Sequence, residues 1–175
     1  RWKQLATQGM WLDEAFSVWM ARLPVAGLFH WIVRVDQHPP LYYLMLHGWM
    51  AAAGDSEGAV RSLSALLSAA TVPAIYFLAR RLLGLPSAVA AALLLAFAPF
   101  HVRFAQEARM YTLYTFNATV ALLGLAYVIT GDGRRRWWAL YIIFSALTLL
   151  SHNTALLFWV AVNAGMGGAS LVARR

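Results

Sequence analysis

The side chains best suited to chemistry in this 175-residue chain lie in short polar stretches between apolar segments. Asp13 and Glu14 form an adjacent acidic pair, and Glu107 stands two positions before Arg109. A carboxylate can take a proton from a hydroxyl group, and the guanidinium fork of an arginine can bind phosphate oxygens. These residue types therefore have the chemistry needed to act on a lipid-borne phosphate.

Each of these residues also has a simpler structural explanation. The carboxylates of Asp13 and Glu14 would be stabilised near the N-terminus of a helix by its dipole. Glu107 and Arg109 are two positions apart, so they would not face each other on a helix and could belong to a solvated loop. His38, which precedes two prolines, could simply cap a turn. Taken singly, the residues leave both explanations open.

The composition of the chain predicts a membrane protein. Hydrophobic residues make up 61% and charged residues 12% of the sequence, whereas about a quarter of a typical soluble domain is charged. A soluble chain of this size could not hide so much apolar surface in one core. The net charge of +7 does not indicate a nucleic-acid partner, because the arginines fall between apolar runs and so suit loops that face anionic lipid. The absence of cysteine from the sequence excludes disulfides and thiolate chemistry.

Uncharged apolar runs fill most of the chain after residue 61. A helix needs about twenty residues to cross a hydrocarbon core of about 30 Å. We therefore expect an all-α, polytopic transmembrane helical bundle, a single membrane domain that is truncated at both ends. The five predicted transmembrane helices of residues 62–175 are 62–79, 82–100, 110–131, 137–151 and 155–173.

Clusters of arginine follow alternate runs of this series, at 80–81, 134–136 and 174–175. Alternate loops lie on the same side of a membrane, and the positive-inside rule makes that side cytoplasmic. The opposite, extracytoplasmic side then receives the polar stretches, which are 1–61, 101–109 and 151–153. Residues that could carry chemistry thus share one face.

Residues 1–61 are predicted to be the first extracytoplasmic loop, with juxtamembrane amphipathic helices. Apolar residues recur at helical spacing before Pro24; they are Leu12, Ala15, Phe16, Trp19, Met20 and Leu23. The polar residues expected on the other face of this helix are Asp13, Glu14, Ser17 and Arg22. Further short helices fit 25–35 and 41–53, each too short to cross a membrane comfortably.

The order of the polar motifs resembles that of a known enzyme superfamily. The motifs are Asp13-Glu14-Ala15, His38-Pro39-Pro40-Leu41-Tyr42-Tyr43, Gly54-Asp55-Ser56-Glu57 leading to Arg61, and Gln106-Glu107-Ala108-Arg109-Met110-Tyr111. In this order they resemble the GT-C superfamily of integral-membrane glycosyltransferases. The nearest resemblance is to the glycosyltransferase family 39-like proteins, kin of protein O-mannosyltransferases and aminoarabinose transferases.

The resemblance implies a glycosyltransferase of a plasma (inner) membrane, with its active site on the extracytoplasmic face. Asp13 and Glu14 would be the catalytic pair, with Asp13 acting on the acceptor hydroxyl, and Arg109 would contact the donor phosphate. His38, Glu107 and Tyr111 are expected to support donor binding. The donor would be a polyprenyl-phosphate sugar, the acceptor a lipid, glycan or protein, and the anomeric carbon would be inverted.

Two other functions and one cofactor stay open at this point. A transporter or flippase usually keeps ionisable residues within its spans, and the five predicted spans have no Asp, Glu, Lys or Arg. A non-catalytic membrane scaffold is the other alternative. A divalent metal ion is a candidate cofactor, with Glu14, His38 and His152 as its ligands, because carboxylate and imidazole groups suit such ions.

Overall fold

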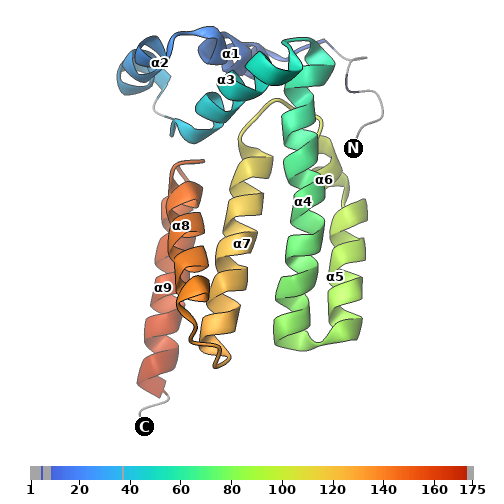
Figure 1. The fold of residues 1–175 in the computed structure, drawn as a ribbon, viewed down its shortest axis with the longest axis vertical. Helices are drawn as coiled ribbons and strands as arrows, with labels where there is room; N and C mark the ends of the chain where they lie inside the picture. The colour runs from blue at the N-terminus through green and yellow to red at the C-terminus, as the bar shows by residue number, and fades with distance from the viewer. Residues whose placement is uncertain (1–4, 6–8, 37, 173–175) are drawn as a thin grey trace.

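The computed structural model describes residues 5, 9–36 and 38–172, and the side chains of all these except residues 36 and 167–172. Every regular element within this described part is a helix (Figure 1). The prediction of an all-α fold is therefore confirmed. The helices form two groups, a short N-terminal layer and a bundle of longer helices on which that layer lies.

The N-terminal layer consists of short helices across one end of the bundle (Figure 1). They are α1 (Leu12–Arg22), α2 (Val25–Trp31), its π-helical continuation η1 (Ile32–Asp36) and α3 (Leu41–Ala53). α1 ends where Pro24 forces the preceding residue into an extended conformation. α3 begins directly after Pro40 and ends at Gly54, whose φ of 88° is one that glycine adopts without strain. The predicted helices of this segment are thus present.

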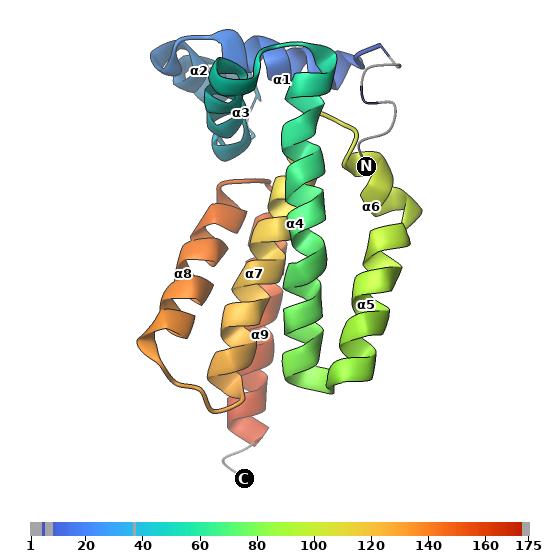
Figure 2. The same cartoon turned by 45° about the vertical axis from the view of Figure 1, so that its right-hand side comes forward.

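The bundle follows in chain order. Its helices are α4 (Glu57–Leu83), α5 (Leu85–Phe97), α6 (Pro99–Phe104), α7 (Tyr111–Ile129), α8 (Arg135–Leu149) and α9 (Ala155–Val172). α4 packs against α5 and α7, and α7 packs against α8 (Figure 2). Ser56 caps α4 by accepting a hydrogen bond from the Ala59 amide at 3.3 Å.

Two helices of the described residues, α4 and α7, are long and apolar enough to cross a membrane. The predicted span 82–100 is not one continuous helix. It divides at Ala98, because Pro99 has no amide hydrogen to continue the ladder and instead begins α6. α5 is left with 13 residues, about 20 Å at the usual helical rise.

The outer surface of the bundle is unusually apolar. Leu94, Phe97 and Phe100 are 74%, 79% and 73% exposed, and many other large apolar side chains share this surface. Contiguous apolar surface of this kind is rare on soluble monomers and marks a membrane or protein contact. The helices are therefore suited to lipid or to further helices around them.

Two of the three predicted arginine clusters lie at one end of the bundle, and the third, 174–175, lies outside the described residues. Arg80 and Arg81 lie at the α4–α5 connection, and residues 134–136 lie at the α7–α8 connection. Both connections lie at the end opposite the N-terminal layer (Figures 1 and 2). The polar residues of 1–61 and the arginine clusters are thus separated by the length of the bundle.

The packing of α1 corrects one prediction. Its apolar residues do not form one covered stripe: Met20 is fully buried, but Leu12 is 86% exposed and Trp19 is 40% exposed. Glu14 and Ser17, both predicted on the polar face, are buried instead. The side of α1 that carries Glu14 and Ser17 therefore faces the bundle, where arginine side chains bond to both. Asp13 and Arg22, the other residues of the predicted polar face, are exposed.

The main hydrophobic core joins the N-terminal layer to the bundle. Its buried side chains come from helices α1 to α4, from the loop between α6 and α7, and from α7 itself. They include Met20, Leu28, Tyr42, Tyr43, Leu46, Val60, Met110 and Leu113. A backbone hydrogen bond of 3.1 Å from Leu41 to Leu150 also ties the start of α3 to the end of α8. The layer is therefore fixed on the bundle end.

α7 and α8 approach each other closely at Gly124. A Cβ atom at this position would lie 2.8 Å from the Tyr141 amide nitrogen and 2.9 Å from the Trp137 carbonyl oxygen. Both atoms belong to the backbone, so neither can move without shifting α8. The absence of a side chain at Gly124 therefore sets the distance between the two helices.

Gly124→Ala is expected to force α7 and α8 apart and to lower the free energy of unfolding by about 1–3 kcal/mol, as overpacking does. Thermal unfolding of the detergent-solubilised protein measures this. Gly48→Ala in α3 is the matched control, because nothing lies within 4 Å of its added Cβ and alanine stabilises a helix by about 0.5–1 kcal/mol relative to glycine. Equal stability of the two variants would contradict the close approach.

Candidate active site

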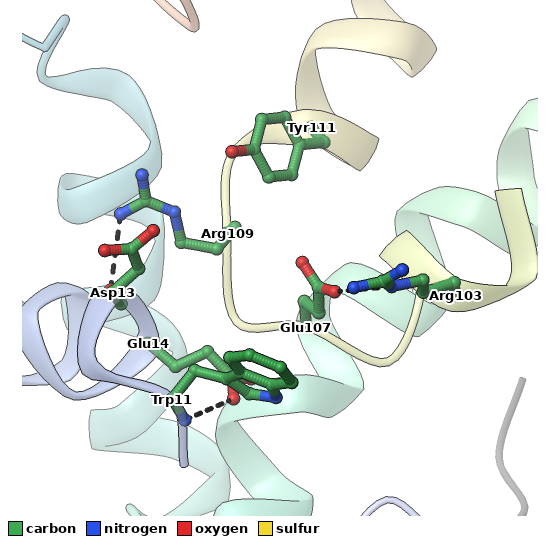
Figure 3. Close-up of a pocket in the computed structure, with 7 residues that line it drawn as sticks. All are labelled: Trp11, Asp13, Glu14, Arg103, Glu107, Arg109 and Tyr111. Atoms are coloured by element: carbon green, nitrogen blue, oxygen red, sulfur yellow. Dashed lines mark hydrogen bonds and ion pairs between the residues drawn. The ribbon is translucent and has the colours of Figure 1, made fainter. Parts of the chain in front are cut away.

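A polar cavity of about 180 Å³ lies where α1 meets the loop between α6 and α7 (Figure 3). Its lining residues are Trp11, Asp13, Glu14, Arg103, Glu107, Arg109 and Tyr111. Asp13, Glu14, Glu107, Arg109 and Tyr111 were predicted as site residues, and the fold brings them together from positions up to 98 apart in the sequence. His38 does not line this cavity.

Glu14 and Arg61 form a buried ion pair beneath the cavity. Arg61 donates from Nε to Glu14 Oε1 at 2.9 Å and from Nη2 to Glu14 Oε2 at 2.8 Å. The two side chains are only 2% and 3% exposed. Such a two-pronged pair fixes both position and direction, so it holds α1 against the start of α4.

The same carboxylate also holds two backbone segments. Glu14 Oε1 accepts a hydrogen bond from the Ala108 amide at 2.7 Å, and Oε2 accepts one from the Trp11 amide at 3.2 Å. Burial raises the pKa of the Glu14 carboxyl, but the hydrogen bonds from Arg61, Ala108 and Trp11 outweigh this effect and hold the pKa below its usual value. The Glu14 carboxylate is therefore ionised inside the protein, where it is held by several hydrogen-bond donors, and is unsuited to exchanging protons with a substrate.

Arg109 is positioned by α1. It is 8% exposed, and its Nη1 donates to the Asp13 carbonyl oxygen and to Ser17 Oγ, both at 3.3 Å. Within the described residues its Nε is buried without a hydrogen-bond partner. A buried guanidinium donor is costly when it is unsatisfied. Arg109 therefore lines the cavity with a guanidinium whose hydrogen-bonding capacity is only partly used by the described residues.

Asp13 presents its carboxylate at the surface of the same cavity. Its side chain is exposed, in contrast to that of Glu14 one position later. Figure 3 shows the Asp13 carboxylate beside the Arg109 guanidinium, with Tyr111 beyond them. Consecutive residues of a helix point about 100° apart, so one acid of the pair enters the core while the other meets the cavity.

The far wall of the cavity is formed by Arg103 and Glu107. Arg103 Nε lies 3.4 Å from Glu107 Oε1, and Arg103 is the more exposed partner, at 64% against 22%. The pair also lines a neighbouring cavity, which Arg61 and Gln106 line as well. Arg103 is therefore a second cation at the cavity, opposite Arg109 (Figure 3).

His38 and His152 form an aromatic cluster behind Tyr111. The two imidazole rings are 6.3 Å apart, and the His152 ring is 5.9 Å from Tyr111 and 5.8 Å from Tyr114. Burial, followed by the charges of His38 and Arg109, lowers the pKa of His152 below its ordinary value. The neutral imidazole therefore prevails at neutral pH. His38 thus contacts His152, which in turn contacts Tyr111 of the cavity.

The three residues proposed as metal ligands do not form a ligand set. Glu14 is engaged by Arg61 and by two backbone amides, while His38 and His152 face each other and Tyr111. Among the residues that the structure describes, no group of three or more His, Cys, Asp or Glu side chains is placed to hold a metal ion. The residue types had suggested a metal site, but the packing of the described residues does not bring these three side chains together.

Three residues of the site were not predicted as part of it. Trp11 lines the cavity from the residue before α1, Arg103 lies on α6, and Arg61 lies beneath the cavity as the partner of Glu14. Arg61 and Arg103 had been assigned only to the polar side of the molecule. A spacing of 47 positions between Glu14 and Arg61 gives no periodic signal, so their pairing is a product of tertiary packing.

Comparison with known proteins identifies a family. A family model described as dolichyl-phosphate-mannose-protein mannosyltransferase matches residues 37–166 of the chain. No curated protein and no solved structure matches it significantly. The matched range contains His38, Arg61, Arg109 and Tyr111, and α1 with the acidic pair precedes it.

Glu14→Ala is expected to lower the free energy of unfolding by about 3–5 kcal/mol, because it removes the carboxylate that accepts two hydrogen bonds from the buried Arg61 guanidinium. Asp55→Ala is the matched control: it breaks an ion pair with Arg22 whose side chains are 58% and 62% exposed, and such pairs contribute about 0–1 kcal/mol. Denaturant titration in detergent, repeated across pH, measures both.

Since the folded-state pKa of Glu14 lies below the unfolded value of about 4.3, wild-type stability should be full above that pH and fall as pH drops through the folded-state pKa. The Glu14→Ala variant should not show this fall in stability at low pH. Equal destabilisation by the two variants would contradict a stabilising role for the buried Glu14 carboxylate.

Proposed function

The chain belongs to the family of dolichyl-phosphate-mannose-protein mannosyltransferases and is a glycosyltransferase of the GT-C type, and from this we propose that it transfers a sugar from a polyprenyl-phosphate donor to an acceptor hydroxyl, with inversion of the anomeric carbon. The observation that carries the proposal is that Asp13 and Arg109 line one cavity, where the Arg109 guanidinium donates to the backbone carbonyl of Asp13. One group suits a hydroxyl proton and the other suits a phosphate.

In the proposed reaction, Asp13 accepts the proton of the acceptor hydroxyl. The acceptor oxygen forms a bond to the anomeric carbon on one face, and the bond from that carbon to the donor phosphate oxygen breaks on the other face. The electron pair of the broken bond leaves with the polyprenyl phosphate. Because attack and departure take place on opposite faces, the configuration of the anomeric carbon inverts.

Arg109 stabilises the departing phosphate in this mechanism. Its hydrogen bonds to the Asp13 carbonyl and Ser17 orient the guanidinium before the donor arrives, so little reorganisation is needed as charge develops. The guanidinium carries five donors, and the hydrogen bonds to Asp13 and Ser17 both use Nη1, so donors remain for a phosphate oxygen. Tyr111, whose ring centroid lies 6.0 Å from the guanidinium carbon, forms the wall beside it.

Glu14 acts in the proposal as a positioning residue and not as the base. Its carboxylate is buried in the ion pair with Arg61, and through Trp11 and Ala108 it fixes the residues next to Asp13 and Arg109. His38 and His152 support Tyr111 from behind. Glu107 holds Arg103 at the far wall, where this second cation is available to the donor phosphate.

The cavity accommodates only the reacting end of the donor. Its volume of about 180 Å³ is smaller than the roughly 300–1,000 Å³ of sites that enclose a whole ligand. The phosphate and the anomeric carbon fit there, while the prenyl chain lies along the apolar outer surface of the helices in lipid. The acceptor, a lipid, glycan or protein, approaches from the water side, where Asp13 is exposed.

The site is proposed to lie on the extracytoplasmic face of the plasma membrane of a multi-pass protein. The arginines of the α4–α5 and α7–α8 connections support this, because they lie at the other end of the bundle and positive loops stay in the cytoplasm.

Asp13→Asn is expected to reduce turnover by about 10²- to 10⁴-fold, since asparagine keeps the shape but cannot accept a proton. Arg109→Gln should reduce turnover by about 10²- to 10³-fold through lost charge stabilisation. The measurement is the consumption of polyprenyl-phosphate sugars by membranes that contain the full-length protein, followed by mass spectrometry. Asp55→Asn is the control, because this exposed acid pairs with Arg22 and does not line the cavity. Asp13→Asn activity within a few fold of the wild type would exclude Asp13 as the base.

Single cysteines test the membrane orientation. Residues introduced at Ser56 and Asn153 are expected to react with an impermeant thiol reagent added to intact cells, and one at Gly133 is not. All three positions are exposed, and the sequence has no cysteine to compete. The reverse labelling pattern would place the candidate site in the cytoplasm and contradict the proposed donor.

A further inference from the structure

A stack of aromatic and cationic side chains lies at the end of the bundle opposite the candidate active site. The rings of Tyr127 and Trp137 are stacked, with centroids 3.8 Å apart and planes inclined by 4°. Arg81 lies over Tyr127 at 4.8 Å, and Arg136 lies over Trp137 at 4.6 Å. This arrangement joins the ends of α4, α7 and α8 and holds two guanidinium groups in place.

A cavity of about 320 Å³ opens beside this stack. Its lining residues are Phe77, Arg80, Arg81 and Tyr127. Three of them belong to one face of α4, because positions three and four apart lie above each other on a helix. The fourth comes from α7, so the cavity is formed between two helices that pack directly together. It is separate from the candidate active site, with which it shares no lining residue.

One cation of this cavity is fixed by the fold. Arg81 donates from Nε to Thr130 Oγ1 at 2.6 Å and from Nη2 to the Thr130 carbonyl oxygen at 3.1 Å. These bonds satisfy the C-terminal end of α7 and orient the guanidinium toward Tyr127. Arg81 therefore contributes both to stability and to the shape of the cavity.

The other cation is held only lightly. Arg80 is exposed, and within the described residues its hydrogen bond is the one from Nη1 to the Tyr76 hydroxyl at 3.2 Å. A single neutral partner leaves a guanidinium with most of its donors for a ligand. Arg80 can thus bind an anion without breaking a contact that the fold requires.

The surroundings of the cavity favour an anion. Residues 76–83 and 127–137 contain five arginines and one acid, Asp132, which gives a net charge of +4. Asp132 Oδ1 lies 3.4 Å from Arg134 Nε and so is already paired. The remaining arginines are not neutralised by carboxylates of these two segments. An approaching phosphate therefore meets a positive field.

The apolar wall indicates an anion that carries a hydrocarbon chain. Phe77 is 51% exposed and lies one turn before Arg80 and Arg81, nearer the middle of helix α4 along its axis. A phospholipid has this order of groups, a charged phosphate at the membrane surface and acyl chains directly below it. A free phosphate has no apolar group that could contact this wall.

We propose that this cavity binds the headgroup of an anionic phospholipid, with the phosphate between Arg80 and Arg81 and an acyl chain along Phe77. Basic pockets between membrane helices are suited to such headgroups. The bound lipid would fasten α4 to α7 at the end of the bundle remote from the catalytic cavity. The proposal does not rest on the proposed transferase reaction.

Native mass spectrometry of the full-length, delipidated protein in detergent tests this. Phosphatidylglycerol and phosphatidylcholine with the same acyl chains are titrated in parallel, and the wild type is expected to retain phosphatidylglycerol in preference. Arg80→Gln should reduce retained phosphatidylglycerol by about fivefold, the ratio that corresponds to about 1 kcal/mol for one arginine near a lipid headgroup. Arg80 is chosen over Arg81 because its loss removes no bond to the α7 terminus.

Arg135→Gln is the matched control. It removes the same charge from the same end of the bundle, but Arg135 does not line the cavity, so retention should be unchanged. Equal loss in the two variants would mean diffuse surface charge and overturn the site, as would equal retention of the two lipids. Glycerol phosphate, the soluble headgroup alone, is expected to leave the bound lipid in place even in excess. Displacement by it would indicate a free-phosphate site and would also overturn the proposal.

Discussion

The buried ion pair between Glu14 and Arg61 is the interaction on which the rest of the N-terminal half depends. A carboxylate loses its hydration when it is buried, and it is stable there only if nearby donors replace the lost water. Glu14 receives four such hydrogen bonds, two from Arg61 and one each from the Trp11 and Ala108 amides. Because these donors come from three separate segments, satisfying one charge fixes α1, α4 and the loop before α7 relative to one another.

The geometry of the candidate active site follows from this arrangement. With Glu14 turned inward, the helix turns its neighbour Asp13 toward the cavity. With Ala108 held by Glu14, the next residue, Arg109, lies against α1 and binds the Asp13 carbonyl. An acidic pair in sequence thus divides its work: one acid builds the site, and the other is presented to a substrate. The proposed catalytic groups are thus positioned by buried hydrogen bonds, which favours a preorganised site.

The two ends of the bundle differ in a way that suits a membrane enzyme. The N-terminal layer carries carboxylates, histidines and a cavity with a buried, incompletely satisfied guanidinium. The opposite end carries arginines stacked on aromatic rings and almost no acid. Between them the helices expose large apolar side chains. Reaction with a lipid-linked donor at one surface and anchorage to anionic lipid at the other are both consistent with this polarity.

The sequence by itself determined the helical class, the helices of 12–22 and 41–53, the end of the bundle at which the arginines gather, and, through the order of its motifs, the family. These properties follow from apolar runs, proline positions and short motifs, which are local and can be read residue by residue. The tertiary structure alone decided that Glu14 is buried with Arg61 and that Trp11 and Arg103 line the cavity. The same acidic pair at the start of a helix is compatible with a solvated face or a buried hub. Burial of the charge is favourable because Arg61 and the Ala108 amide, 47 and 94 positions away in the sequence, donate hydrogen bonds to it. No local sequence pattern predicts these contacts.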